Sequence, residues 1–423
     1  MHIIRYLPRY IKTPVQFIAN RLLLATEIYR SEKYIRLGAV DNQSTNISVP
    51  LVFSGFLEEP LGIGRAARLV MDRFRGSGLE IIPHDLRKVL DHAPRDGLCL
   101  PGGPGGVWFI NANAPECVVA LATINRKSWA PRYRIGYWAW ETTQAPESWV
   151  RTAQWFHEIW AISQFSRDGI AAAFTAAGRP DLVSRLRVQP LPFPIISAAP
   201  NRARWGLKPE SFVALSSFDG QSTLARKNPI GAVKAWIAAF PQPKWDKQLL
   251  IKAHSMSAET RGAAELRELI SDRPDIRIID RKLADSEMES LISSVDLIIS
   301  LHRSEGFGLP IAEAMAAGIP VLITGFSAPM EFVSDTTGFI VPAKVVPVED
   351  PSGTYQTGMW SEPDLKIASE ILREISKNPD LRKIKATNAL RHIQGLKTRW
   401  GREFSDKQVW RSLVSNTQAA NEP

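Results

Sequence analysis

One segment of the chain stands between a strand-like and a helix-like pattern, and it reads Ser304-Glu305-Gly306-Phe307-Gly308-Leu309-Pro310-Ile311-Ala312-Glu313. The apolar run 296–301 before it predicts a buried strand, and the apolar-periodic stretch 309–317 predicts a helix that ends at Gly318. Two glycines between strand and helix let the backbone approach a ligand closely. Free amides and the dipole at the helix start attract anions such as phosphate. The segment therefore predicts a strand–turn–helix unit with an anion-binding turn.

Apolar runs alternate with apolar-periodic segments on both sides of this unit. In the second half, strands are predicted at 212–218, 248–253, 276–280 and 319–323, and helices at 228–240, 258–271, 285–293 and 365–378. In the first half, strands are predicted at 47–53, 79–83, 107–111, 133–138 and 158–163, and helices at 66–74 and 166–177. Such alternation predicts an α/β protein with doubly wound parallel sheets, which bind ligands at the carboxyl ends of their strands.

The chain of 423 residues is longer than one core ordinarily supports, so two domains are expected. Four prolines between positions 190 and 200 favour an extended linker and mark the boundary. We therefore predict one Rossmann-like domain at 48–195 and a second at 205–395. An N-terminal extension at 1–47 and a C-terminal helical tail at 396–423 flank them.

The composition, 44% hydrophobic and 22% charged, is typical of a soluble globular protein. No run of about 18 apolar residues predicts a membrane-spanning helix. Cys99 and Cys117 are too few for a disulfide framework or a metal site, and they fit a reducing cytoplasm. Basic residues such as Arg9 and Lys12 interrupt any apolar core of a signal peptide, so none is expected.

The net charge of +9 favours anionic partners, and part of it lies in the first 47 residues. That segment has seven Lys or Arg against three acidic residues, with Arg5, Arg9 and Lys12 at helical spacing. Apolar residues between these charges make it a basic amphipathic stretch, which can lie on an anionic membrane surface. The alternative is a helix docked on the protein's own surface.

A second strand-to-helix turn reads Ser217-Phe218-Asp219-Gly220-Gln221-Ser222-Thr223-Leu224-Ala225-Arg226-Lys227-Asn228-Pro229. Pro229 suits the first position of a helix. Arg226 and Lys227 would place fixed positive charge beside free amides there, as a diphosphate requires. The alternative is a solvated basic pair. Because both turns follow strands of one predicted parallel sheet, we expect them to meet at the same edge.

The C-terminal half resembles the donor domain of the retaining glycosyltransferases of family four, which have the GT-B fold. The signature of that family is two glutamates separated by seven residues, matched by Glu305 and Glu313, and the likeness runs through SEGFGLPIAEAMAAGIPVL. The Arg226–Lys227 pair also matches. In the first half, WAWE (Trp138–Glu141), IWAISQFSRDGI (Ile159–Ile170) and the Gly62–Arg65 loop resemble the same family. The resemblance covers roughly residues 50–395 and leaves 1–47 outside it.

This resemblance implies a role for each matched residue. Glu313 would hold the nucleotide ribose, Arg226 and Lys227 would neutralise the diphosphate, and Glu305 would orient the donor sugar. The nucleotide base would lie near 280–283. The further donor-binding candidates are Gly306, Phe307, Gly308, Leu309, Asp219, Lys252, His254, Gly62 and Gly64.

No cofactor and no metal is expected. The chain contains no Asp-x-Asp, the usual carboxylate pair for a divalent metal, so cations and amides of the protein would stabilise the departing diphosphate. The resemblance implies retention of anomeric configuration with no established covalent enzyme intermediate. That argues against a hydrolase acid–nucleophile pair made of Glu305 and Glu313.

The acceptor side is matched less closely. Many relatives have a histidine near the reacting sugar, and this chain offers no match, but Glu141 lies in the family-like segment. It could accept a proton from the acceptor hydroxyl, hydrogen-bond the sugar, or be only a structural acid at a strand end. Trp138 and Trp140 are the candidates for stacking on an acceptor sugar, although core packing is the common fate of such aromatics.

We therefore predict a glycosyltransferase that moves a mannose-like or glucose-like hexose from a nucleotide-diphosphate sugar to a glycan or lipid-linked acceptor. It would act in polysaccharide or glycolipid biosynthesis, in the cytoplasm or on the inner face of the membrane, without nucleic acid. A nucleotide-sugar epimerase of GT-B fold is one alternative, and it would need no second sugar. A non-enzymatic binder of membrane or nucleic acid is the other, and it would not depend on Glu305 or Glu313.

Overall fold

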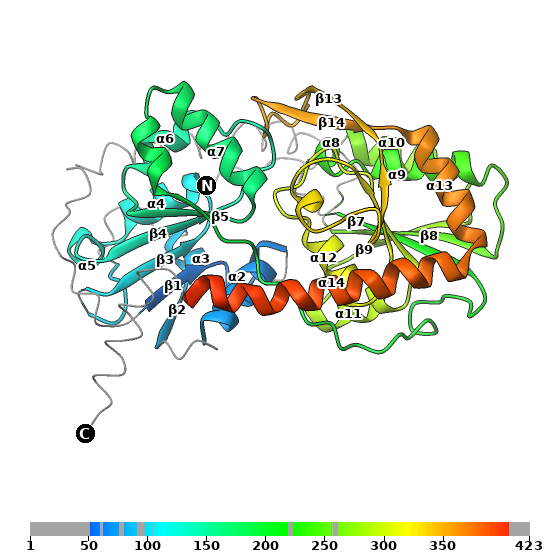
Figure 1. Cartoon of the computed structure of the whole chain (residues 1–423), viewed down its shortest axis with the longest axis horizontal. Coiled ribbons are helices and arrows are strands. Elements are labelled where there is room, and N and C mark those ends of the chain that lie inside the picture. Colours follow the sequence, from blue (N-terminus) through cyan, green and yellow to red (C-terminus); the bar gives the residue numbers. More distant parts are fainter. Residues whose placement is uncertain are drawn as a thin grey trace, which may run out of the picture.

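The computed structural model describes residues 51–59, 62–75, 80–90, 98–103, 105–218, 223–254, 256 and 261–405. The predicted extension 1–47, the candidate Asp219 and the end of the predicted tail lie outside these residues. The described chain forms two lobes side by side, each built on a parallel sheet with helices packed on it (Figure 1). The predicted α/β class with two Rossmann-like domains is confirmed.

The first lobe contains a six-stranded parallel sheet. In spatial order its strands are β2 (Ile81–Asp85), β1 (Leu51–Gly55), β3 (Val107–Asn111), β4 (Tyr133–Trp138), β5 (Glu158–Ala161) and β6 (Leu186–Val188). The helices of this lobe are α2 (Gly62–Arg75), α3 (Leu86–Leu90), α4 (Ala114–Thr123), α5 (Arg126–Trp129), α6 (Ser148–Ala153), α7 (Gln164–Ala176) and the 3-10 helix η2 (Pro180–Arg185). Strands β1 and β3 are buried along their whole length, because helices cover the sheet on both faces.

The second lobe repeats this architecture. Its strands, in spatial order, are β12 (Phe339–Val341), β11 (Val321–Thr324), β10 (Leu297–Ser300), β7 (Phe212–Ser217), β8 (Lys247–Ala253) and β9 (Ile276–Asp280). Its helices are α8 (Leu224–Lys227), α9 (Pro229–Ala239), α10 (Arg261–Leu269), α11 (Asp285–Ser293), α12 (Leu309–Ala316), η3 (Ala328–Glu331), α13 (Leu365–Lys377) and α14 (Pro379–Ser405). All the pairings in this sheet are parallel.

Two of the differences from the sequence-based expectation bear on the site. The glycines at 62 and 64 begin helix α2 instead of forming a loop before it, because the chain turns at residues 56–59 and the carbonyls there pack on the first helical turn. An antiparallel hairpin of β13 (Ala343–Pro347) and β14 (Met359–Pro363) was not predicted. Its two strands are separated by an eleven-residue polar loop, whose composition gives no turn signal of a tight hairpin.

The last described helix joins the two lobes. Helix α14 runs along both of them in Figure 1, and the Arg73 side chain of α2 donates to the Lys397 carbonyl at 3.1 Å. Among the described helices, none is both long enough and apolar enough to cross a membrane.

Candidate active site

The predicted site lies at the point in the second sheet where the order of successive strands reverses, between β7 and β10. From β7 the chain winds outward through β8 to β9, whereas β10 leads to β11 and β12 on the other side. The connections after β7 and β10 therefore run to opposite sides of the sheet, and ligands of open α/β sheets bind at such a point, outside the carboxyl ends of the strands. Helix α8, with Arg226 and Lys227, follows β7, and the turn with Glu305 follows β10. The predicted meeting of these two turns is confirmed.

Backbone and side-chain hydrogen bonds fasten the two turns together. Asn228, in the left-handed conformation between α8 and α9, donates to the Leu301 carbonyl at 2.9 Å. The Arg303 amide donates to the Arg226 carbonyl at 2.8 Å, and the Arg303 side chain donates to the Ala225 carbonyl at 2.5 Å. These contacts fix the spacing between the two basic residues and Glu305.

Glu305 is the centre of a buried ionic cluster. Its Oε2 lies 3.1 Å from Nη1 of Arg226, and its Oε1 pairs with Nζ of Lys227. Arg226 also donates to the Ser304 carbonyl at 3.0 Å, and the Glu305 amide donates to Ser327 at 2.9 Å. Glu305 and Arg226 are 6% and 5% exposed, so this charge cluster acts in a region of low dielectric, where electrostatic interactions are strong.

The ionisation of the cluster follows from burial and pairing. Burial alone would raise the pKa of Glu305, but Lys227 and Arg226 outweigh it and lower that pKa to about 2. Burial also opposes the charge of Arg226, yet the carboxylates of Glu305 and Glu141 help to raise its pKa above the ordinary value. For Lys227, burial prevails over Glu305 and lowers the pKa. Burial and pairing thus shift the pKa values of the two basic residues in opposite directions, upward for Arg226 and downward for Lys227.

The first lobe closes over this cluster with the segment that follows β4. Half-buried Glu141 accepts a hydrogen bond from the hydroxyl of Tyr355 at 2.9 Å, and Tyr355 belongs to the loop between β13 and β14. The ring of Tyr355 lies 5.7 Å from the Arg226 guanidinium carbon. The structure thus brings Glu141 to the Glu305–Arg226 cluster through a residue of the other lobe.

Glycine at 306 favours this close approach. A Cβ there would lie 3.1 Å from the Trp140 carbonyl and 3.3 Å from Cγ of Glu141. The Gly306 carbonyl accepts from the hydroxyl of Ser163, the N-cap of α7, at 2.6 Å. The predicted ligand-facing glycine therefore also serves as the contact between the lobes.

The other residues of the same turn are held by packing. Gly308 has φ of 89° and precedes α12, a conformation in which a side chain is strained. The Phe307 ring packs against Phe193 of the linker and Phe332, with centroids 5.6 and 5.3 Å apart. Half-buried Leu309 starts α12 and packs on the same core.

Glu313, one turn into α12, faces a different part of the interface from Glu305. Its carboxylate pairs with Nε of Arg65, which comes from α2 of the first lobe. Arg65 also reaches Glu289 at 2.9 Å and Asp285 at 3.3 Å, and Arg68 reaches Asp285 at 2.9 Å. Two arginines of α2 are thus paired with three carboxylates of α11 and α12. We call these five residues the interlobe clasp.

Burial gives Glu313 an unusual pKa. Desolvation raises the pKa to about 7, with Arg65 opposing the shift and Asp285 and Glu289 adding to it. Glu313 is 3% exposed. Its charge state therefore changes near neutral pH, unlike that of Glu305.

The glycines before Arg65 have separate functions. A Cβ on Gly64 would lie 1.9 Å from the Glu59 carbonyl, so glycine at this position allows the helix to pack on the preceding turn. Gly62 is exposed, and a Cβ there would meet nothing within 4 Å. Donor binding by Gly62 and Gly64 stays a prediction.

The prediction that Trp138 and Trp140 line an acceptor cleft does not fit the structure. Trp138 is fully buried and packs edge-on against Trp149 and Phe156, with centroids 5.4 and 5.6 Å apart. Trp140 is 5% exposed and packs on Trp149 and Tyr355. Their faces belong to the core of the first lobe, because the helices over β4 need large apolar side chains to fill the space.

Lys252 and His254 are buried at the carboxyl end of β8, next to β7. The Lys252 ammonium donates to the Ala253 carbonyl, so it is directed along its own strand. Asp280, beside the predicted base region, accepts from the Met256 amide at 3.3 Å.

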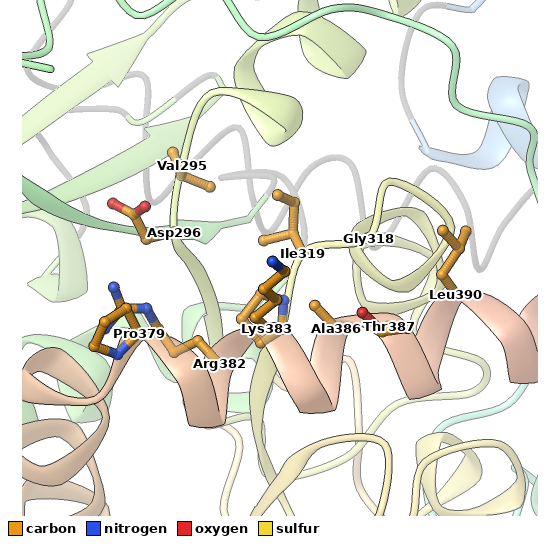
Figure 2. A pocket seen from close by; sticks show the side chains of 11 residues that line it. Val295, Asp296, Gly318, Ile319, Pro379, Arg382, Lys383, Ala386, Thr387 and Leu390 are labelled. Carbon is orange, nitrogen blue, oxygen red and sulfur yellow. The ribbon is translucent and has the colours of Figure 1, made fainter.

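A cavity of about 330 Å³ lies at the opposite edge of the second sheet (Figure 2). It is lined by Asp296 and Ile319, which precede β10 and β11, and by residues of α14 such as Arg382, Lys383 and Thr387. Asp296 is already paired with Arg202 at 2.6 Å. This cavity takes no part in the Glu305 cluster.

Sequence reasoning missed two residues of the site, Arg65 and Tyr355. Arg65 stands directly after the glycines that were singled out, and a charged residue in the first turn of a buried helix was the available signal. Tyr355 is 214 positions from Glu141, and no local pattern connects the two.

Comparison with known proteins gives the family of the second lobe. Residues 224–351 match the family model described as glycosyl transferases group 1. No curated protein matches the chain in sequence. The matched range contains Arg226, Lys227, Glu305 and Glu313, and ends before Tyr355.

Solved structures share the fold of both lobes. The sucrose-phosphate synthase of Thermosynechococcus elongatus has a TM-score of 0.60 at 14% identity, covering 86% of this chain and 99% of that one. HepE of Anabaena, solved with UDP and glucose, has a TM-score of 0.57 at 15% identity, covering 85% and 100%. A glycosyltransferase of Rickettsia africae has a TM-score of 0.56 at 15% identity, covering 88% and 98%. With the group 1 glycosyl transferase model matched across its Glu305 site and both lobes arranged as in these proteins, the chain is a glycosyltransferase of the GT-B fold.

Proposed function

We propose that the chain transfers a hexose from a nucleotide-diphosphate hexose to a glycan or lipid-linked acceptor, with retention of configuration. The observation that carries the proposal is the buried Glu305–Arg226–Lys227 cluster at the switch point of the second sheet. The HepE structures, which hold UDP, UDP with glucose, or UDP-glucose, support a nucleotide-sugar donor for this fold.

The proposed mechanism uses the charges of the protein. As the nucleoside diphosphate leaves, negative charge grows on its phosphate oxygens. Arg226, Lys227 and the N-terminus of α12 would stabilise that charge, and preorganised electrostatic stabilisation is commonly the largest catalytic contribution. Glu305, ionised because of its low pKa, would hold the sugar hydroxyls next to the reacting carbon. No metal ion is needed in this scheme.

Donor binding would bring the nucleotide ribose to Glu313, which now pairs with Arg65. The ribose of a nucleotide offers two vicinal hydroxyls, and a carboxylate accepts both. In the structure the Arg65 guanidinium pairs with the Glu313 carboxylate. The proposal therefore requires the ribose to share or replace this contact of the interlobe clasp.

The cellular location of the enzyme is proposed from the charge of its N-terminal segment. The net positive charge of residues 1–47, which lie outside the described residues, suits an anionic membrane surface. We place the enzyme in the cytoplasm or on the inner face of the membrane, in polysaccharide or glycolipid assembly.

The proposal is tested by following thermal stability with UDP-glucose, GDP-mannose and ADP-glucose. We expect one nucleotide to raise Tm by roughly 5 °C at a hundredfold excess over Kd, and Glu313→Ala to abolish the shift. Glu289→Ala is the matched control, because it also removes a carboxylate from Arg65 but not the ribose partner. The absence of any shift, or an equal shift in Glu313→Ala, would contradict the proposal.

Nucleotide binding is also expected to depend on pH through Glu313. Because the pKa of this acid is raised to about 7, the carboxyl is mostly protonated at pH 6 and mostly ionised at pH 8. Only the ionised form accepts from both ribose hydroxyls, so nucleotide affinity should rise about tenfold over this range. Isothermal titration at both pH values measures it. Glu313→Gln keeps the titration of the phosphate itself and should lose the additional dependence; an identical pH dependence in both proteins would contradict the prediction.

A further inference from the structure

The loop between β13 and β14, residues 348–358, has a fixed internal structure. Both carboxylate oxygens of Asp350 accept hydrogen bonds from the loop, including those from the amides of Ser352, Thr354 and Tyr355, each at 3.0 Å. Tyr355 itself is 7% exposed. The hydrogen bonds to Asp350 order this polar loop, and they thereby hold the buried Tyr355 within it in a defined place.

The same loop is fastened to the first lobe just beyond Glu141. The Met359 amide donates to the Thr143 hydroxyl at 2.8 Å, and the Thr142 hydroxyl donates to the Thr357 carbonyl at 3.0 Å. Gly358 has φ of 84°, and a Cβ there would lie 2.8 Å from the Gln144 amide nitrogen. The loop is therefore clamped on the segment that carries Glu141.

Tyr355 contacts both halves of the candidate site from this clamped position. Its hydroxyl donates to Oε2 of Glu141 at 2.9 Å, and its ring lies over the Arg226 guanidinium at 5.7 Å. The ring also packs on Trp140, with centroids 5.2 Å apart. Burial raises the pKa of the Tyr355 hydroxyl well above 10, so it remains a donor at any working pH.

We propose that Tyr355 is a positioning residue of the transfer reaction, whose hydroxyl orients the Glu141 carboxylate and whose ring orients the Arg226 guanidinium. One side chain of the 348–358 loop thereby sets the distance between the acceptor-side acid and the cation that faces the leaving group. With Oε2 held by Tyr355, Glu141 presents Oε1 to the substrate. The inference rests on the proposed function and adds a component from outside the matched range 224–351.

The first test is Tyr355→Phe, which keeps the ring on Arg226 and removes only the hydroxyl. Turnover is measured as release of nucleoside diphosphate from whichever of UDP-glucose, GDP-mannose and ADP-glucose binds, with water as acceptor. We expect kcat to fall about tenfold, the scale of a hydrogen bond to a charged group, while donor KM stays within about twofold. Tyr133→Phe is the matched control. It also removes a tyrosine hydroxyl that donates to a glutamate, Glu158 at 3.1 Å, but at the amino end of β4, whereas Glu141 follows the carboxyl end of that strand.

A double-mutant cycle separates positioning from mere structural support. If Tyr355 acts through Glu141, the double variant Tyr355→Phe with Glu141→Gln should be no slower than Glu141→Gln alone. Asp350→Ala, which loosens the loop without touching the site, should lower kcat in the same way as Tyr355→Phe.

Two results would overturn the inference: full kcat in Tyr355→Phe, or additive losses in the cycle. Glu305→Gln is measured alongside. An active Glu305→Gln would remove the proposed function, whereas an inactive Glu305→Gln with a fully active Tyr355→Phe would remove only the inference.

Discussion

Replacing Glu305 with glutamine is expected to lower turnover about a thousandfold, while nucleotide affinity stays the same or increases. The turnover loss has the scale seen when one preorganised electrostatic group is removed from a buried site. Affinity changes the other way because Glu305 neutralises both Arg226 and Lys227 in the structure. Without that carboxylate, an incoming diphosphate would take the place of the anion that pairs with both cations.

Loss of stability must be separated from loss of catalysis in this variant. Glu305→Gln leaves Arg226 without its buried anion, and breaking a buried ion pair costs about 3–5 kcal/mol. Lys227 can release its proton, because burial already lowers its pKa, so the cost should lie at the lower end of that range. Thermal unfolding gives the stability loss directly.

Asp275→Asn provides a control of similar burial. Asp275 is 4% exposed and pairs with Arg273 at 2.7 Å in the same lobe, ahead of β9 and away from the site. This variant should lose comparable stability and keep its turnover. The assignment of Glu305 is wrong if Glu305→Gln retains turnover within tenfold of the unmodified protein.

The part of the fold that the sequence predicted well is the part encoded locally. Strands at 107–111, 133–138 and 276–280 have the expected bounds, because a short apolar run between polar turns favours a strand in such an alternating pattern. The β13–β14 hairpin was missed because its strands mix lysine, serine and glutamate with apolar residues. Its position depends on contacts with the first lobe that no local pattern contains.

The candidate site divides in the same way. Glu305, Arg226 and Lys227 were predicted because each follows a strand of one sheet, and the ends of neighbouring parallel strands must meet. Arg65 and Tyr355 act across the interface between lobes, and their partners are hundreds of residues away. The prediction that Trp138 stacks on an acceptor sugar could not be checked from the sequence. An aromatic residue at a strand end has the same local pattern whether it packs in the core or contacts a ligand.

Replacing Arg226 with glutamine is expected to weaken nucleoside diphosphate binding about tenfold or more and to lower turnover by about two to three orders of magnitude. The guanidinium is the cation whose charge is permanent, since its pKa is raised despite burial, with the carboxylates of Glu305 and Glu141 contributing. Calorimetry with UDP and GDP measures the first effect, and nucleoside diphosphate release from the bound donor measures the second.

Lys227→Gln is the informative comparison, because the two cations differ in how their charge is maintained. Burial lowers the pKa of Lys227, so this ammonium loses its proton at a lower pH than an ordinary lysine does. The cost of removing it should therefore be smaller than for Arg226, and it should shrink as pH rises and the lysine loses its charge. Equal losses at all pH values would show that both act as fixed charges.

If these side chains take the place of a metal ion, EDTA should leave the unmodified protein active and added Mg²⁺ should not rescue Arg226→Gln. A strict need for a divalent metal would instead mean that the diphosphate charge is balanced elsewhere.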